Sequence, residues 1–255
     1  MKSLTLAGMV LLACQAEGPA KPSKALDPKD PRSVLDHAVY NTRTQKNYET
    51  KFKAQLSTTG APLNYEGKCV WVNPGVLYVH YTASGGDEKM IVRAGPQDAW
   101  VYHSLVDDWM TADQVGMPGA ARGIQNPDEV LAVVGRHTGS AKLTQPGSVE
   151  LTFSGDDIEK IMKEQASKDA FDWKESSAKL ELTVDADNRL QKFTCEATLK
   201  SNNPNVKGAV HYTAEVSLVA YGGARELKYL DEKKREIPLR KEMTAKIETV
   251  LKEKQ

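Results

Sequence analysis

The stretch that decides the fold is Tyr48–Leu56, which reads YETKFKAQL. Apolar or weakly polar side chains occupy every second position, and charged or amide side chains occupy the positions between them. Successive side chains of a β-strand point to opposite faces of a sheet. Strict alternation therefore predicts a strand with one buried face and one wet face.

Further strand-like runs follow, and the first of them lie at intervals short enough to predict an antiparallel meander. Gly or Pro stands between the early runs, where a tight reversal of the chain needs it. The runs are Tyr65–Val72, Val76–Ala83, Lys89–Ala94, Ala99–His103, Ala141–Thr144, Val149–Phe153, Ala178–Val184, Phe193–Leu199 and Val210–Leu218, with one more short strand expected in Arg225–Leu230. Such a sheet has one apolar face that other elements must cover.

Helical patterns are fewer and mostly short. Asp30 and Pro31 form a capping start for a helix to about Thr44, whose apolar stripe faces the sheet. A second start at Asn126 leads into a nearly all-apolar segment ending at Gly135, which predicts a helix buried against the sheet. A third amphipathic helix is expected at Asp156–Gln165.

Two segments leave alternatives open. The Gly-, Ala- and Met-rich run Val115–Ile124 is either a lid over a binding site or a plain surface connector. The charged C-terminal helix that follows Pro238 carries a narrow apolar stripe, which either packs on the convex side of the sheet or binds a protein partner.

The N-terminus has the features of a signal peptide. Leu4–Ala13 is apolar but too short to span about 30 Å of hydrocarbon as a helix, and Cys14 follows it directly. This ending resembles the lipobox of bacterial lipoproteins. The resemblance implies that residues 1–13 are removed and that Cys14 carries the lipid, although an ordinary secretory signal is the alternative. The Pro-rich residues 14–31 then form a disordered tether.

Composition and motifs exclude several function classes. Lys plus Arg and Asp plus Glu both number 34, so net charge gives no case for nucleic acid binding. The histidines lack the spacing of metal ligands, and no nucleophile or phosphate-binding motif is present. We therefore expect no catalytic residue, no metal and no cofactor. Cys69 and Cys195 are expected as free buried thiols rather than a disulfide, since their strands should lie far apart.

The pattern as a whole resembles the LolA-like lipoprotein-carrier superfamily, including its LppX and LprG branch. The resemblance rests on Tyr48–Leu56, on Val76–Val79 ahead of Trp109, on the helix start at Asn126, and best on Leu180–Phe193. It implies an α+β domain over residues 32–232: a strongly curved antiparallel half-barrel with helices covering its concave face. The charged helical segment 233–255 departs from the pattern.

The same resemblance implies a function. Proteins of this superfamily bind acyl chains between sheet and helices, so we expect an envelope lipoprotein that binds lipid or a lipoprotein's acyl chains without catalysis. Gln15 favours the periplasmic side of the outer membrane, since Asp at this position directs retention in the inner membrane of enteric bacteria. The alternative is a structural or sensory lipoprotein that binds a protein partner.

Candidate cavity residues are apolar side chains on the predicted strands and on the helix after Asn126. The alternative for each is a closed, dry core. They are Phe52, Leu56, Trp71, Leu77, Val79, Met90, Val92, Val130, Val134, Leu182, Phe193 and Val210.

Overall fold

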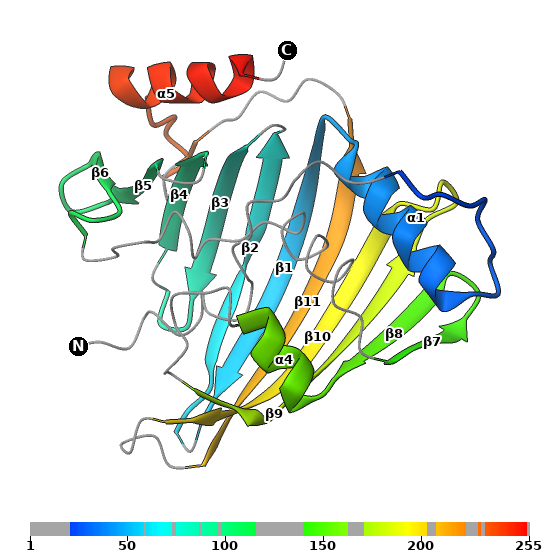
Figure 1. Ribbon diagram of the computed structural model, residues 1–255. Coiled ribbons are helices and arrows are strands. Elements are labelled where there is room, and N and C mark those ends of the chain that lie inside the picture. The colour runs from blue at the N-terminus through cyan, green and yellow to red at the C-terminus, as the bar shows by residue number, and fades with distance from the viewer. Residues whose placement is uncertain are drawn as a thin grey trace.

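The computed structural model describes residues 21–58, 60–72, 75–86, 88–95, 98–115, 140–162, 171–202, 208–222, 229–230 and 233–253. Its strands form one 11-stranded antiparallel sheet in the order β6-β5-β4-β3-β2-β1-β11-β10-β9-β8-β7 (Figure 1). The strands are β1 (Asn47–Ser57), β2 (Leu63–Val72), β3 (Val76–Ala83), β4 (Glu88–Ala94), β5 (Asp98–His103), β6 (Asp108–Thr111), β7 (Ser140–Gln145), β8 (Ser148–Phe153), β9 (Phe171–Val184), β10 (Leu190–Ser201) and β11 (Ala209–Tyr221). The helices are α1 (Pro31–Arg43), α4 (Gly155–Met162) and α5 (Lys241–Lys252).

Most of the predicted strands are confirmed, because alternating side chains mark them directly. Strand β3 coincides with the predicted run, whereas β9 starts at Phe171, seven residues before Ala178. The four-residue strand β6 was not predicted. Most of the strand expected in Arg225–Leu230 lies outside the described residues, and Leu230 itself forms a single bridge with Glu236. The predicted helix after Asn126 lies outside the described residues.

Strands β1 to β6 form one half of the sheet and strands β7 to β11 form the other, and the two halves meet where β1 pairs with β11. Strand β1 pairs with β2 on one side and with β11 on the other, so that Phe52 lies between Gly67 and Val216. The sheet is open, since β6 and β7 are its outer strands. Figure 1 shows it strongly bent, with α1 and α4 on one side. The architecture is a large, open and curved antiparallel sheet with few helices in its described part.

Helix α1 is fixed at both ends by local chemistry. The backbone N–H of Arg32 donates to the Asp30 carboxylate at 3.0 Å, as the capping prediction required. At the other end, the buried Thr42 hydroxyl accepts from the backbone N–H of Leu190 at 2.8 Å. The Asn41 amide donates to the Asp187 carbonyl at 3.0 Å. These bonds hold the end of α1 against the turn between β9 and β10.

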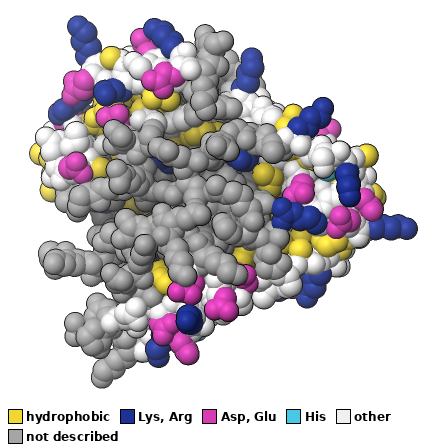
Figure 2. Space-filling view, viewed as in Figure 1, with side chains coloured by type: hydrophobic (Ala, Val, Ile, Leu, Met, Phe, Trp, Pro, Cys, Tyr) yellow, Lys and Arg dark blue, Asp and Glu magenta, His cyan; other side chains and the backbone are white. Residues whose placement is uncertain are grey.

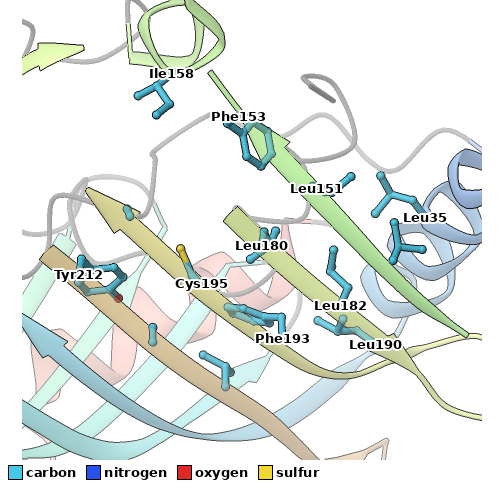
Figure 3. Close-up of a cluster of buried hydrophobic side chains, with 14 of the residues drawn as sticks. Leu35, Leu151, Phe153, Ile158, Leu180, Leu182, Leu190, Phe193, Cys195 and Tyr212 are labelled. Atoms are coloured by element: carbon cyan, nitrogen blue, oxygen red, sulfur yellow. The ribbon is translucent and has the colours of Figure 1, made fainter. Parts of the chain in front are cut away.

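We call the face that carries α1 and α4 the inner face. A buried apolar cluster joins both helices to β8–β11. Figure 3 shows Ile158 of α4 near Phe153 of β8, and Leu35 of α1 near Leu151 of the same strand. The main helix contacts are with β7, β8 and β10 for α1, and with β8 and β9 for α4. This half of the inner face is a conventional packed core.

The opposite, outer face is covered over β3 and β4 by α5 (Figure 1). Met243 of α5 and Trp109 of β6 are both 0% exposed and belong to one apolar cluster. Arg240 donates through both Nε and an Nη atom to the Asp108 carboxylate, with the Nε bond at 2.9 Å. The apolar stripe of α5 thus packs on the chain's own sheet, the first of the two outcomes considered for it.

Charges on the surface are mixed. Figure 2 shows Lys and Arg interspersed with Asp and Glu over α5 and around the α1 end of the molecule, as expected for a chain with zero formal net charge. Within the described part of the chain, no helix has the length and apolar character needed to cross a membrane.

Candidate functional site

The apolar inner face continues beyond the two helices, over the strands from β1 to β5. It is formed by side chains that are all at most 9% exposed: Tyr48, Cys69, Trp71, Leu77, Val79, Ile91 and Val101. We call this set the β1–β5 apolar surface. The main contacts of α1 and α4 lie on other strands, so the described helices fill only the other half of this face.

The structure brings most of the predicted cavity residues to the inner face. Trp71, Leu77 and Val79 belong to the β1–β5 apolar surface. Leu56, Leu182, Phe193 and Val210 belong to the core under α1 and α4. Val130 and Val134 lie outside the described residues. The candidate set thus divides between a packed core and the surface beside it.

Met90 and Val92 do not join this set. Both lie in the outer-face cluster with Met243 and Trp109, so placing them beside Leu77 and Val79 was wrong. The pairing shows why: Val79 lies opposite Ile91, and Leu77 opposite Arg93, so Met90 and Val92 point the other way. Strand β4 is buried on both faces from Met90 to Ala94. Alternation alone cannot tell which face of such a strand is the inner one.

Phe52 links the two halves of the inner face. It is partly buried and packs against both the α1/α4 core and the β1–β5 apolar surface. Its cross-strand neighbours are Val216 of the core side and Gly67 of β2. A ligand lying on the β1–β5 apolar surface would therefore meet Phe52 where the packed core begins.

Three comparisons with known proteins gave matches only among solved structures. No family model matches the sequence, and no curated protein matches it. Among solved structures, LprF from Mycobacterium bovis matches with a TM-score of 0.38 and 10% identity, covering 80% of this chain and 97% of that one.

Two further solved structures match with similarly low TM-scores and identities. A LolA superfamily protein from Nitrosomonas europaea matches with a TM-score of 0.32 and 10% identity, covering 80% of this chain and 96% of that one. A putative outer membrane lipoprotein-sorting protein domain from Vibrio parahaemolyticus matches at 0.33 and 7%, covering 78% and 95%.

Sequence reasoning missed a buried cation on the inner face. Arg93 is buried and pairs with Leu77 of β3 and Ala99 of β5. Its Nε donates to the Gly95 carbonyl at 2.9 Å. A guanidinium matches the geometry of a carboxylate or phosphate. The signal was present in the sequence, because Arg93 interrupts an otherwise apolar strand end at the same face as Ile91.

Cys69 and Cys195 are free thiols, as expected, but their two strands lie closer together in the sheet than expected. Only β1 and β11 separate β2 from β10, because β1 pairs with β11 at the centre of the open sheet. Three strand spacings still amount to about 14 Å, far beyond the reach of a disulfide. Burial raises the pKa of each thiol to about 12, so both stay protonated at neutral pH.

A second concavity, of about 680 Å³, crosses β10, β11, β1, β2 and β3. Its lining includes the charged residues Lys53, Glu66 and Glu215, and the Lys53 Nζ lies 3.4 Å from the Glu66 carboxylate. Within the described ranges, no group of three or more His, Cys, Asp and Glu residues could hold a metal ion.

Proposed function

We propose that this protein is a non-catalytic envelope lipoprotein that binds lipid, or the acyl chains of another lipoprotein, on its inner face. One observation carries the proposal: the inner face is apolar from β8 across to β5, whereas α1 and α4 make their main contacts with β7–β10 only. In this proposal the sheet is a half-barrel with the inner face as its concave side, and acyl chains bind over the β1–β5 apolar surface.

The chemistry of that surface fits an acyl chain better than a polar ligand. Each methylene removed from water contributes about 0.8 kcal/mol, so a long chain needs apolar area and few directed bonds. Trp71, Leu77 and Val79 would supply such area. Each is at most 7% exposed in this structure, so an acyl chain would have to take the place of the atoms that now cover them. Arg93 lies on the same face and would bind the anionic end of a fatty acid or a phosphate headgroup.

The proposed location follows from the N-terminal sequence. We propose that Cys14 carries the lipid anchor, that residues 14–31 are the tether and that the domain is held at a membrane of the bacterial envelope. An outer-membrane position facing the periplasm remains the preferred one, on the basis of Gln15.

Substitution of Phe52 by Glu tests the proposal. The carboxylate would lie against the bound acyl chain and lose hydration without gaining a partner. Loss of the phenyl contact alone costs about 2 kcal/mol, so the affinity for a fluorescent fatty acid should fall at least about thirtyfold. Fluorescence titration of the purified full chain measures this affinity.

The matched control is Lys51→Glu, since Lys51 is exposed and adjacent in β1 but points to the opposite face. Its affinity for the fatty acid should stay within about twofold of the unsubstituted chain. Circular dichroism and thermal unfolding of both variants exclude a loss of fold. Equal affinities in the two variants would remove the inner face from the binding site.

The structure gives no support to the alternative that the C-terminal helix binds a protein partner. The stripe of α5 that a partner would contact is Met243, Ile247 and Val250, and these residues pack in the outer-face cluster of the chain itself. We therefore propose lipid, or an acylated lipoprotein, as the ligand class.

A further inference from the structure

The turn between β5 and β6 exposes two aliphatic side chains in sequence. Leu105 is 90% exposed and Val106 is 57% exposed, the largest values among the large hydrophobic residues of the described chain. Turns ordinarily carry Gly, Pro, Asn, Asp or Ser at such positions, because polar side chains are better solvated there. A leucine exposed to this degree at the tip of a hairpin is therefore a candidate contact residue.

The tip is held in place by specific bonds. The backbone N–H of Val106 donates to the His103 carbonyl at 3.1 Å. Asp107 adopts a left-handed conformation, with φ of 51°, and its carboxylate accepts a hydrogen bond from the Tyr102 hydroxyl. Arg235 lies 3.4 Å from the same carboxylate. The apolar pair therefore projects from a fixed turn rather than from a loose loop.

A basic side chain lies next to this tip. Arg235 connects the turn to the exposed segment Lys233–Glu236, in which Lys233 and Lys234 precede Arg235 in sequence and Glu236 follows it. Asp107 and Asp108, the nearby acids, are already engaged by Arg235 and Arg240. Aliphatic side chains that lie beside an arginine suit the boundary between lipid headgroups and acyl chains.

The shape of the tip selects its partner. A stable protein interface buries about 800 Å² on each side, which is more than two side chains on a convex turn can supply. A bilayer surface needs no complementary shape and can surround such a tip. Insertion of Leu105 and Val106 alone would be weak, but it would orient a domain that a lipid anchor already holds at the membrane.

We propose that the β5–β6 tip, Leu105 and Val106, inserts into the headgroup region of the membrane to which the protein is anchored. The proposal rests on the lipid-anchored carrier function proposed above. It adds an orientation: the sheet edge formed by β5 and β6 faces the bilayer, so that a bound acyl chain leaves the protein next to the membrane.

The test places an indole at the tip and, as a control, at another exposed leucine. Leu105→Trp and Leu63→Trp are made in the full chain, purified with its anchor and inserted into vesicles of phosphatidylcholine with one quarter phosphatidylglycerol. Leu63 is 40% exposed and lies at the start of β2, and the native tryptophans are at most 9% exposed. The unsubstituted chain gives the background.

Brominated acyl chains in the vesicles quench indoles that enter the bilayer surface. Above background, quenching of the Leu105→Trp chain should be at least about threefold that of the Leu63→Trp chain, since an inserted indole lies at headgroup depth. Equal quenching in both chains, or none above background for Leu105→Trp, would overturn the proposal. Thermal unfolding confirms that both chains are folded.

A second arm removes the apolar tip with Leu105→Ser and Val106→Ser together. Transfer of a fluorescent fatty acid from the protein to the vesicles should slow about tenfold, as expected when one or two aliphatic contacts are lost. Affinity for the fatty acid in vesicle-free buffer should not change. An unchanged transfer rate, or a loss of affinity in buffer, contradicts the proposed role of the tip. Failure of the unsubstituted chain to bind fatty acid would count against the carrier function, and the quenching result would still stand.

Discussion

A chain that ends at Ile237 is expected to be largely unfolded, or to aggregate, under conditions in which the full chain is folded. The deletion removes Met243, which is 0% exposed, and with it the partly buried Leu239, Ile247 and Val250. Each fully buried aliphatic side chain contributes about 1.5–3 kcal/mol, so the combined loss is about 5 kcal/mol or more. Typical domains are stable by only about 5–15 kcal/mol in total.

The loss goes beyond the helix itself. Removal of α5 exposes Trp109 and Met90 on the outer face and leaves Asp108 without Arg240, whose hydrogen bonds hold the pKa of that carboxyl below its usual range. Val250 also lies over the turn glycines Gly75 and Gly95, where a Cβ at either position would come within 3.5 Å of it.

Point variants make this prediction quantitative. Met243→Ala should lower the free energy of unfolding by about 2–5 kcal/mol, whereas Lys241→Ala, at an exposed position of the same helix, should change it by less than about 0.5 kcal/mol. Urea denaturation followed by circular dichroism measures both. A truncated chain as stable as the full one would show that α5 is a dispensable appendage, and would return it to consideration as a partner-binding helix.

Gly67→Ala is expected to destabilise the protein by about 3 kcal/mol or more, a large effect for one methyl group. A Cβ on Gly67 would lie 2.2 Å from the His80 carbonyl oxygen and 2.6 Å from the Tyr81 Cβ. Both contacts are far inside van der Waals distance, and the first is with backbone, which cannot turn away. Strands β2 and β3 would have to separate where Gly67 pairs with Tyr81.

Gly67 occupies a position where the two halves of the inner face meet. Gly67 lies between Phe52 and Tyr81 on the inner face, at the boundary between the packed core and the β1–β5 apolar surface. A glycine in a strand often allows a tight bend or a close approach of backbones. The same substitution at Gly60, where an added Cβ would meet nothing within 4 Å, should leave the melting temperature almost unchanged. Similar melting temperatures for the two variants would contradict the strand geometry.

Local signals in the sequence predicted most of the strands and helices, but they did not predict how these elements are arranged. Alternation located β3 to the residue, and the Asp30–Pro31 pair located the start of α1. The β1–β11 pair could not be predicted, because nothing in either strand specifies a partner more than 150 residues away. That pairing decides which strands are central, and it corrected the expected distance between Cys69 and Cys195.

Faces were harder to predict than strands. Met90 and Val92 were placed on the inner face because β4 is apolar on both sides, and α5, which covers its outer side, has only a narrow apolar stripe. Arg93 was not predicted as an inner-face residue, because a single arginine near the end of an apolar strand usually marks the place where the strand reaches solvent. The pairing of β4 with β3 and β5 places it on the inner face instead.

The most direct test of the lipid-binding proposal is native mass spectrometry of the full chain purified from bacterial membranes in mild detergent. We expect the unsubstituted protein to carry a bound lipid in addition to its covalent anchor, Phe52→Glu to lose it and Lys51→Glu to retain it. Protein that is free of non-covalent lipid in all three forms, and that takes up no fatty acid when one is supplied, would contradict the account.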